Sequence, residues 1–404
     1  MENLFIARQP IYDQQLKVIG YELLYRNGDV DRAIFDDHDQ ASCETILNTF
    51  MHIGIDNIAG SALVFINLPD KFLLNETLTP MFREQTVLEV LEHVTSSAQL
   101  IDNIRRLKAE GYRVALDDFN FRPELAALVE LADYVKIDVL ANSPEQIEQE
   151  LEQLRPYSAR IIAEKVETQE MYSFCQQLGF RYYQGFFFCK PQTVRQKHVP
   201  AIRAVVLNLL GKLQHPEVDY DELEDILAQD VSLSYKLLRY INSAMFSLRR
   251  EVDSIKDAVV LLGLNNVRQW LSLILMSRLS DAKPDELILT ALIRARMCEN
   301  LAEKLQPEVR SQMFIIGLFS ILDALMDTPM IELLDSVILS TPVKLALLDK
   351  AGPQGDIYQM VLDYEHFNWD RLSARDIPTA VFVEAYIEAI EWANANLNAL
   401  ARAA

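Results

Sequence analysis

Seven short apolar runs in the first half of the chain each lead into a polar side chain, and this pattern restricts the fold more than any other feature. The runs cover residues 18–24, 62–67, 87–90, 113–117, 134–137, 160–163 and 182–188. Longer amphipathic stretches, such as 98–109 and 144–154, lie between them with apolar residues at helical spacing. Strand and helix units that alternate in this way predict a compact (β/α) barrel rather than an open sheet.

The second half of the chain has a different pattern, because after Lys190 and Pro191 no run is typical of a strand. Apolar residues recur there every three or four positions, which predicts an all-helical domain. Examples of the expected helices are 201–213, 220–229, 233–242, 254–262, 266–277, 286–305, 312–325 and 378–396. Asp219, Asp230 and Ser254 stand where N-caps are expected, and Gly263 stands where a helix ends. We place the boundary near residues 191–200.

Composition excludes several classes of protein. The formal net charge of −21 argues against general binding of nucleic acid, which needs clustered Lys and Arg. The four cysteines form no CxxC pair, and none of the six histidines is paired at ligand spacing, so a zinc site is not expected. The N-terminus lacks the features of a signal peptide, and no stretch reaches the ~18 continuous apolar residues of a membrane span. We therefore expect a soluble cytoplasmic protein.

The polar residues at the strand ends point to a metal site. They include Glu22, Asn67, the pair Glu89 and Glu92, Asp117 and Asp118, Lys136 and Asp138, Glu164 and Glu167, and Gln184. In barrels of this type the carboxyl ends of the strands meet at one face, where the active site lies. Carboxylate and amide oxygens suit Mg²⁺ or Mn²⁺. Such a site can hold two ions that activate a water and bind a phosphoryl oxygen.

Taken in order, these motifs resemble the EAL domain of cyclic-di-GMP phosphodiesterases over residues 1–193. The matching motifs are Glu22-Leu23-Leu24 for the name-giving Glu-Ala-Leu, with Arg26 after it, then Asn67, Glu89-Val90-Leu91-Glu92, Asp117-Asp118-Phe119, Lys136-Ile137-Asp138, Ala163 to Thr168, and Gln184-Gly185-Phe186. The resemblance implies a (β/α)8 TIM-like barrel. It also implies hydrolysis of cyclic-di-GMP to linear pGpG, and a role in motility and biofilm control.

The resemblance further implies the metal ligands. Glu22, Asn67, Glu92 and Asp117 would hold one ion, and Asp117 or Asp118 would bridge to a second. The ions would be Mg²⁺ or Mn²⁺, two in each active site.

The catalytic and substrate-binding roles also follow from the resemblance. Lys136 would hold or polarise the attacking water, Glu164 would be the general base, and Gln184 would orient the water. Glu167 would secure the loop after Asp-Asp-Phe. The expected substrate contacts are Arg26, Glu22, Leu24 and Gln184.

Three positions depart from the family's pattern. The glycine- and serine-rich loop after Asp-Asp-Phe is replaced by residues 120–125, which include Pro123. Leu23 replaces the alanine of Glu-Ala-Leu, and Lys165 replaces the glycine between Glu164 and Glu167. Two alternatives therefore stay open beside hydrolysis of cyclic-di-GMP. The barrel would be a catalytically inactive receptor or scaffold, or it would hydrolyse another phosphodiester.

The helical half resembles the HDOD domain over about residues 197–390, and we expect this domain to occupy 197–404. The resemblance rests on residues 230–248 and on a second signature at 254–268. Related hydrolases bind metal through a His-Asp doublet, but Asp323 has no neighbouring His. The resemblance implies a regulatory module that binds a protein partner. Barrels of this family commonly dimerise through the loop that is altered here, so the sequence leaves open whether the chain forms a homodimer.

Overall fold

The computed structural model describes residues 4–27, 58–68, 83–91, 97–189, 201–213, 223, 231–242, 252, 254–277, 279, 283–337 and 339–403. The chain divides into two units, Met1–Phe188 and Cys189–Ala404. The first contains the strands, and the second is built from helices.

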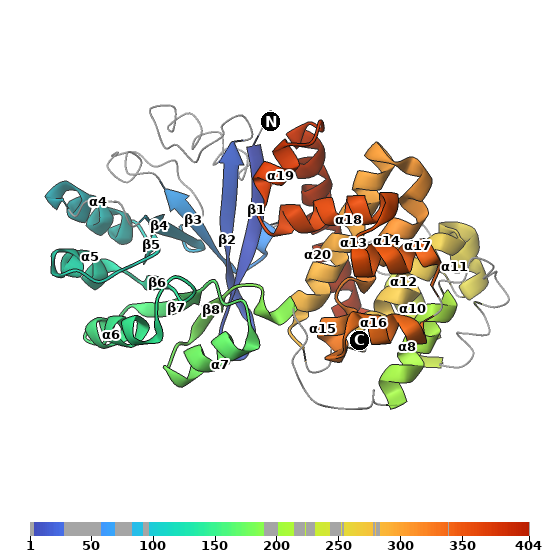
Figure 1. The fold of residues 1–404 in the computed structure, drawn as a ribbon, viewed down its shortest axis with the longest axis horizontal. Helices are drawn as coiled ribbons and strands as arrows, with labels where there is room; N and C mark the ends of the chain where they lie inside the picture. The colour runs from blue at the N-terminus through green and yellow to red at the C-terminus, as the bar shows by residue number, and fades with distance from the viewer. Residues whose placement is uncertain are drawn as a thin grey trace. The chain divides into compact units, whose positions relative to one another are not determined.

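Eight strands close into a barrel in the order of the sequence (Figure 1). They are β1 (Leu4–Tyr12), β2 (Val18–Asn27), β3 (Leu63–Leu68), β4 (Thr86–Val90), β5 (Arg113–Leu116), β6 (Tyr134–Asp138), β7 (Arg160–Glu164) and β8 (Tyr182–Gln184). Each of the seven predicted runs overlaps one of the strands β2 to β8, so the predicted TIM-like barrel is confirmed. Strands β2 to β8 pair in parallel, which brings their carboxyl ends to one face.

Strand β1 was not predicted, and it changes the expected repeat. It runs antiparallel to both of its neighbours, β2 and β8, so the barrel begins with a hairpin and not with a strand–helix unit. The turn is fixed by Asp13, whose carboxylate accepts the N–H groups of Gln15 and Lys17, both at 2.9 Å. The run 182–188 was predicted too long, because the chain leaves the strand at Gly185 and then forms a 3₁₀ turn at Phe187–Cys189.

Four described helices lie outside the barrel: α4 (Ala98–Ala109), α5 (Ala126–Leu131), α6 (Pro144–Leu154) and α7 (Gln169–Gln177) (Figure 1). The bounds of α4 and α6 agree with the predictions. Their starts are set by side-chain caps, since Ser97 and Ser143 accept backbone N–H groups of the first turn. These helices bury one apolar face.

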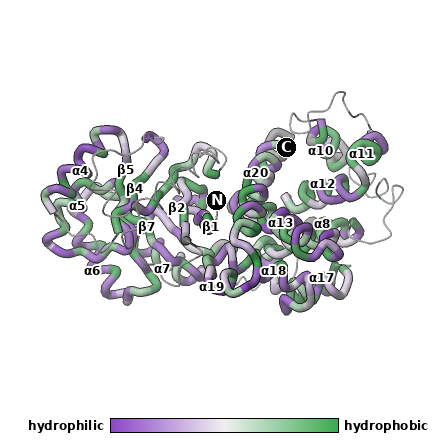
Figure 2. The backbone as a smooth tube through the Cα atoms, turned by 90° about the horizontal axis from the view of Figure 1, so that it is seen from above, coloured by the Kyte–Doolittle hydropathy of each residue, from purple (hydrophilic) through white to green (hydrophobic). Residues whose placement is uncertain are grey.

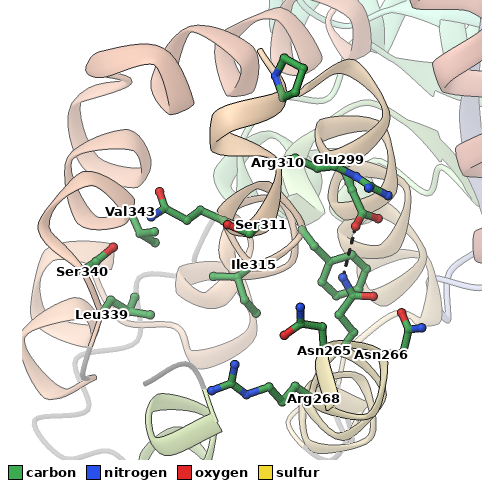
Figure 3. Close-up of a pocket in the computed structure, with 14 residues that line it drawn as sticks. Asn265, Asn266, Arg268, Glu299, Arg310, Ser311, Ile315, Leu339, Ser340 and Val343 are labelled. Carbon is green, nitrogen blue, oxygen red and sulfur yellow. Dashed lines mark hydrogen bonds between the residues drawn. The ribbon is translucent and has the colours of Figure 1, made fainter. Parts of the chain in front are cut away.

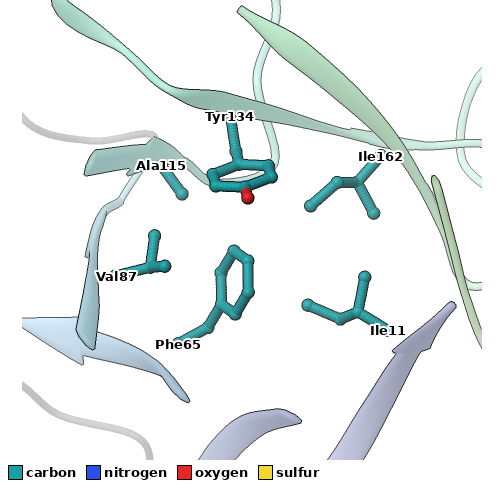
Figure 4. Packing of buried hydrophobic residues seen from close by; sticks show 6 residues of the cluster. All are labelled: Ile11, Phe65, Val87, Ala115, Tyr134 and Ile162. Atoms are coloured by element: carbon teal, nitrogen blue, oxygen red, sulfur yellow. The ribbon is translucent and has the colours of Figure 1, made fainter. Parts of the chain in front are cut away.

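The interior of the barrel is filled by one apolar layer of Ile11, Phe65, Val87, Ala115, Tyr134 and Ile162 (Figure 4). Successive side chains of a strand point to opposite faces, so the residue two positions further on also points into the barrel. Gly20 leaves room for this layer, since a Cβ there would lie 2.9 Å from the ring of Phe65. The apolar layer therefore forms a floor for the polar residues that follow it along each strand.

The second unit is helical throughout its described part, as the sequence predicted. Its helices are α8 (Ala201–Leu213), α10 (Val231–Ile241), α11 (Ile255–Leu262), α12 (Leu264–Ser277), α13 (Asp285–Leu305), α14 (Arg310–Phe319), α15 (Leu322–Met326), α16 (Met330–Ser336), α17 (Thr341–Asp349), α18 (Gly352–Glu365), α19 (Trp369–Ser373) and α20 (Thr379–Ala403). Hydrophobic residues recur along these helices between hydrophilic ones (Figure 2). Helix α13 lies against α14 at Gly317, where a Cβ would meet the backbone of Ala295 at 2.4 Å.

Most predicted helix limits in this unit hold. Ser254 caps α11 and Gly263 ends it at φ 84°. The predicted helix 312–325 is wrong as a single element, because the chain turns between α14 and α15. The predicted helix 220–229 lies almost wholly outside the described residues, as do the N-caps Asp219 and Asp230.

One stretch, Pro307–Met326, is long and apolar enough to cross a membrane, with a mean hydropathy of 1.5. However, 78% of it is buried inside the structure, as in the core helix of a soluble protein. Helices α11 and α12 pass the same test only together, and they are bent by 116°.

Candidate active site

A polar layer follows the apolar floor, and period-two geometry generates it. The inward residue two positions after the floor residue is Asn67 on β3, Glu89 on β4, Asp117 after β5, Lys136 on β6 and Glu164 on β7. Glu22 on β2 and Gln184 on β8 complete the layer. The barrel thus gathers these side chains although they are far apart in sequence.

Lys136 lies at the centre of this layer and is fully buried. Its Nζ atom lies 2.9 Å from Glu22 Oε2, 2.8 Å from Glu89 Oε1, 2.8 Å from Asp117 Oδ1 and 2.7 Å from Glu164 Oε1. One ammonium group therefore faces four carboxyl groups. If all were ionised, the group would carry an excess of negative charge in a region of low dielectric constant.

The pKa values reflect this crowding. Burial raises the pKa of Glu89 well above its usual value, and the charge of Glu22 adds to the shift. Burial likewise raises the pKa of Glu164, to about 8, although Lys136 acts in the opposite direction. Burial would lower the pKa of Lys136, but the surrounding carboxylates raise it well above its usual value. The site therefore retains protons that a divalent cation would displace.

The residues present fit a divalent metal ion. Glu22, Glu89 and Asp117 each offer a carboxylate oxygen, and these atoms lie within 4.8 Å of one another. Asn67 donates its Nδ2 to Glu22 Oε1 at 2.9 Å, while its buried Oδ1 atom receives no hydrogen bond. The Oε2 atom of Glu89 and the Oε1 atom of Gln184 are also buried without a donor. Buried oxygen acceptors without partners are what a hard cation needs as ligands.

The sequence assigned the ligand role in the Glu-x-x-Glu motif to Glu92, which lies outside the described residues. The carboxylate that joins the site is Glu89, which points inward from β4 and is fully buried. The alternation of side chains along β4 marks Glu89 as an inward residue, since it follows the floor residue Val87 by two positions.

Gln9 is a site residue that the sequence did not suggest. The Nε2 atom of Gln184 donates to Glu22 Oε2 at 2.6 Å and to Gln9 Oε1 at 2.8 Å. Gln9 lies on β1 directly opposite Glu22. It could not be found while β1 itself was unpredicted.

Three further residues that the sequence predicted are Leu24, Arg26 and Glu167. Leu24 and Arg26 lie on β2 beyond Glu22, and Leu24 is partly buried. Glu167 is exposed just before Thr168, which caps α7. The roles given to these residues, in substrate binding and in securing the loop, stay predictions.

Lys165 lies in a second, outer group of charges. Its Nζ atom is 2.5 Å from Asp138 Oδ2 and 3.1 Å from Asp118 Oδ1. Burial would raise the pKa of Asp138, but the ammonium of Lys165 and the N–H groups of Ala141 and Leu140 lower it. The lysine therefore does not enter the inner group around Lys136, which leaves the Glu22, Glu89 and Asp117 oxygens facing one another.

The loop after Phe119 is packed and contains none of the expected glycines. Pro123 begins a 3₁₀ turn that leads into α5. Phe121 packs against the rings of Phe119 and Tyr157, with centroids 6.4 and 6.0 Å apart. Its N–H group donates to the carboxylate of Glu150 on α6. Aromatic packing and this hydrogen bond hold the loop in place.

The helical unit buries a different charged group. Arg294 on α13 donates from Nε and Nη2 to the two carboxylate oxygens of Glu365, both at 2.6 Å, and from Nη1 to Ser320 Oγ at 3.0 Å. Asp323, where a His-Asp doublet would place its acid, has a pKa raised by burial. Within the described part of this unit we find no cluster of side chains that would hold a metal ion.

A cavity of about 580 Å³ also lies in the helical unit, lined from α12, α13, α14 and α17 (Figure 3). Its lining mixes arginines, amides and apolar side chains. Glu299 accepts hydrogen bonds from Gln269 at 3.4 Å and from Arg296 at 2.6 Å, and Arg310 lies 3.4 Å from Glu303. Because these polar groups already pair with one another, we assign no ligand to this cavity.

Comparison with known proteins divides the chain in the same way. The family model described as EAL domain matches residues 2–191, and the model described as HDOD domain matches residues 199–330. The cyclic di-GMP phosphodiesterase CdgJ of Vibrio cholerae is 33% identical over 97% of this chain and 93% of its own length. The protein YuxH of Bacillus subtilis is 32% identical over 96% of this chain and 98% of its own.

Among solved structures, the EAL-domain protein YkuI of Bacillus subtilis, in complex with cyclic-di-GMP and calcium, is 18% identical with a TM-score of 0.38. That match covers 64% of this chain and 73% of YkuI. The two full-length relatives and the two matching models together establish the family. The chain belongs to the proteins in which an EAL domain is followed by an HDOD domain.

Proposed function

We propose that the barrel hydrolyses cyclic-di-GMP to linear pGpG in a reaction that depends on a divalent metal ion. The observation that carries this proposal is the convergence of four carboxyl groups on Lys136, beside three buried oxygen atoms that have no donor. The relative CdgJ, whose printed name is cyclic di-GMP phosphodiesterase, supports the choice of substrate.

The inner group would bind the metal ion through Glu22, Asn67, Glu89 and Asp117. This set adds Glu89 to the residues that the sequence predicted, and the role predicted for Glu92 stays a prediction because Glu92 lies outside the described residues. When bound, Mg²⁺ or Mn²⁺ would lower the pKa of a water molecule and polarise the phosphoryl group. Asn67 is held for this role because its amide nitrogen already donates to Glu22, which turns the carbonyl oxygen away from that partner.

Glu164 would act as the general base. A base works best when its pKa lies near the operating pH, and burial raises the pKa of Glu164 to about 8. Lys136 lies 2.7 Å from this carboxylate and would stabilise its ionised form. Gln184 would position the attacking water, since its Oε1 atom is free to accept a hydrogen bond. Arg26 and Leu24 would contact the substrate beyond Glu22.

An assay of the full-length protein with cyclic-di-GMP and Mn²⁺ tests the proposal. We expect linear product from the wild type and a loss of at least about a hundredfold in Glu89→Gln, because the neutral amide removes one anionic ligand. Glu152→Gln is the matched control, since Glu152 is exposed on α6. Binding of the nucleotide without any product would contradict hydrolysis and favour the receptor alternative.

We also propose that the helical unit binds a protein partner. Tyr235 on α10 and Val260 and Leu261 on the neighbouring α11 expose 61%, 79% and 49% of their surface. Val260 and Leu261 are adjacent in sequence and α10 contacts α11, and exposed apolar patches mark interaction surfaces. Crosslinking in cells that express the full chain, followed by identification of the crosslinked protein, tests this surface. We expect a specific adduct that Tyr235→Glu with Val260→Glu abolishes, and an unchanged adduct would contradict the assignment.

A further inference from the structure

Lys165 occupies a backbone position that disfavours any side chain. Its φ angle is 57°, in the left-handed region that L residues with a Cβ rarely adopt. The corresponding family motif has glycine, which adopts this conformation without strain. The lysine is therefore kept in a strained conformation, and strain of this kind is maintained where the side chain has a role.

The side chain of Lys165 is committed to two acids. Its Nζ atom lies 3.1 Å from Asp118 and 2.5 Å from Asp138. Asp138 is itself fixed, because it accepts the N–H groups of Leu140 at 2.8 Å and Ala141 at 2.9 Å. The side chain of Asp138 exposes 12% of its surface, so this end of the pair is shielded from water. The ammonium group is thus held in one place by a rigid acceptor.

The resemblance gives the bridge to a second metal ion to Asp117 or Asp118. Asp117 contacts Lys136 in the inner group, which leaves Asp118 as the acid for an outer ion. Asp118 follows Asp117 directly and has a left-handed backbone itself, with φ 42°. An ammonium group within 3.1 Å of its carboxylate neutralises that charge and would repel a divalent ion placed there. Lys136, in contrast, lies among four inner carboxyl groups. Their negative charges, when all four are ionised, outnumber its single positive charge.

We infer that Lys165 is a tethered cation that takes the place of the second divalent ion, so that this barrel binds one divalent ion per chain. The inference rests on the proposed function, since it assigns the single ion to the inner group. A lysine at this place would supply positive charge and hydrogen bonds on the outer side of the site, but it cannot coordinate a hydroxide as a metal ion does.

Titration of the full-length protein with Mn²⁺, with free ion measured by electron paramagnetic resonance, tests the inference without any activity assay. We expect one bound Mn²⁺ per chain in the wild type and two in both Lys165→Gly and Lys165→Met. Lys304→Met is the matched control, because it removes a surface ammonium that pairs with Glu384 on α20, and it should keep one ion.

Two bound ions in the wild type would overturn the inference and leave the proposed metal site intact. One ion in each Lys165 variant would overturn it as well, because the lysine would then not be what excludes the second ion. No bound ion in any protein would contradict the metal site itself and the inference with it. Circular dichroism melts confirm that each variant is folded before it is titrated.

Discussion

Each unit of the molecule buries a basic side chain against carboxylates, but the two units differ in how the positive charge is matched. Arg294 in the helical unit meets a single carboxylate, Glu365, in a bidentate pair. Lys136 in the barrel meets four carboxyl groups. A balanced pair with all its hydrogen bonds made is complete as it stands. A group with excess acid is electrically balanced only when it binds protons or another cation. This need for a further cation distinguishes the barrel as the unit that holds the active site.

The first prediction breaks the balanced pair. We expect Arg294→Met to destabilise the helical unit by about 3–5 kcal/mol, because Glu365 would remain largely buried without its partner. Urea unfolding followed by tryptophan fluorescence measures this unit alone, since Trp270, Trp369 and Trp392 all belong to it.

Arg375→Met is the control for this experiment, because Arg375 pairs with Asp356 in a partly exposed bridge. We expect it to change the stability by less than about 1 kcal/mol. An equal loss of unfolding free energy in the two variants would show that the buried pair of Arg294 and Glu365 stabilises the unit no more than a surface pair does.

The second prediction adds a divalent cation to the excess of acid in the barrel. At a hundred times its dissociation constant, Mn²⁺ should stabilise the barrel by about 2.7 kcal/mol. Hydrogen exchange of the amides in β4 to β7, measured with and without Mn²⁺, locates the effect. Glu89→Gln should reduce the protection, whereas Arg294→Met should leave it unchanged. Protection by Mn²⁺ in the helical unit instead of the barrel would reverse the comparison between the two units.

The third prediction uses protons to probe the same excess of acid, in metal-free protein. Because folding raises the pKa of Glu164 to about 8, the folded state binds more protons than the unfolded chain between its ordinary pKa and 8. Stability from this group is therefore present at low pH and is lost as the pH rises through that window. From pH 6 to pH 7 we expect a loss of about 1 kcal/mol in the barrel.

Glu164→Gln should reduce this pH dependence, since the amide does not titrate, and the part that remains would come from Glu89, whose pKa burial also raises. Hydrogen exchange of the β7 amides at the two pH values, in EDTA and corrected for the intrinsic rate, measures it. A barrel that becomes more stable between pH 6 and pH 7 would contradict the assigned shift.

The sequence allowed much of the barrel to be predicted, because strands that end in polar residues are a local pattern. Glu22, Asp117 and Lys136 were singled out for that reason, and the structure brings them together. Glu89 was named only as one of a pair with Glu92, and Gln9 was not named, because the importance of both depends on which face of a strand they occupy and on which strand lies opposite. That information comes from pairing and register, which one short run does not contain.

The position of Lys165 could not be predicted for a related reason. The sequence shows a lysine where the family has glycine, and this alone leaves open whether the ammonium enters the inner group. Its outward position depends on the left-handed backbone and on Asp138, which lies on a different strand. In the helical unit, periodicity predicted most helices, but the turn after Phe319 was missed because the apolar pattern continues across it.

Because Gly185 has no side chain, the end of β8 can lie directly against the loop after β7. A Cβ there would lie 2.0 Å from the carbonyl oxygen of Val166, so the end of β8 touches the backbone of the loop after β7. The N–H of Val166 donates to the carbonyl of Gln184 at 2.9 Å across this contact. Glu164 and Lys165 are thus attached to the same rigid frame as Gln184. A displacement of the loop after β7 would therefore also displace Gln184. The positions of Glu164, Lys165 and Gln184 are coupled through this backbone contact.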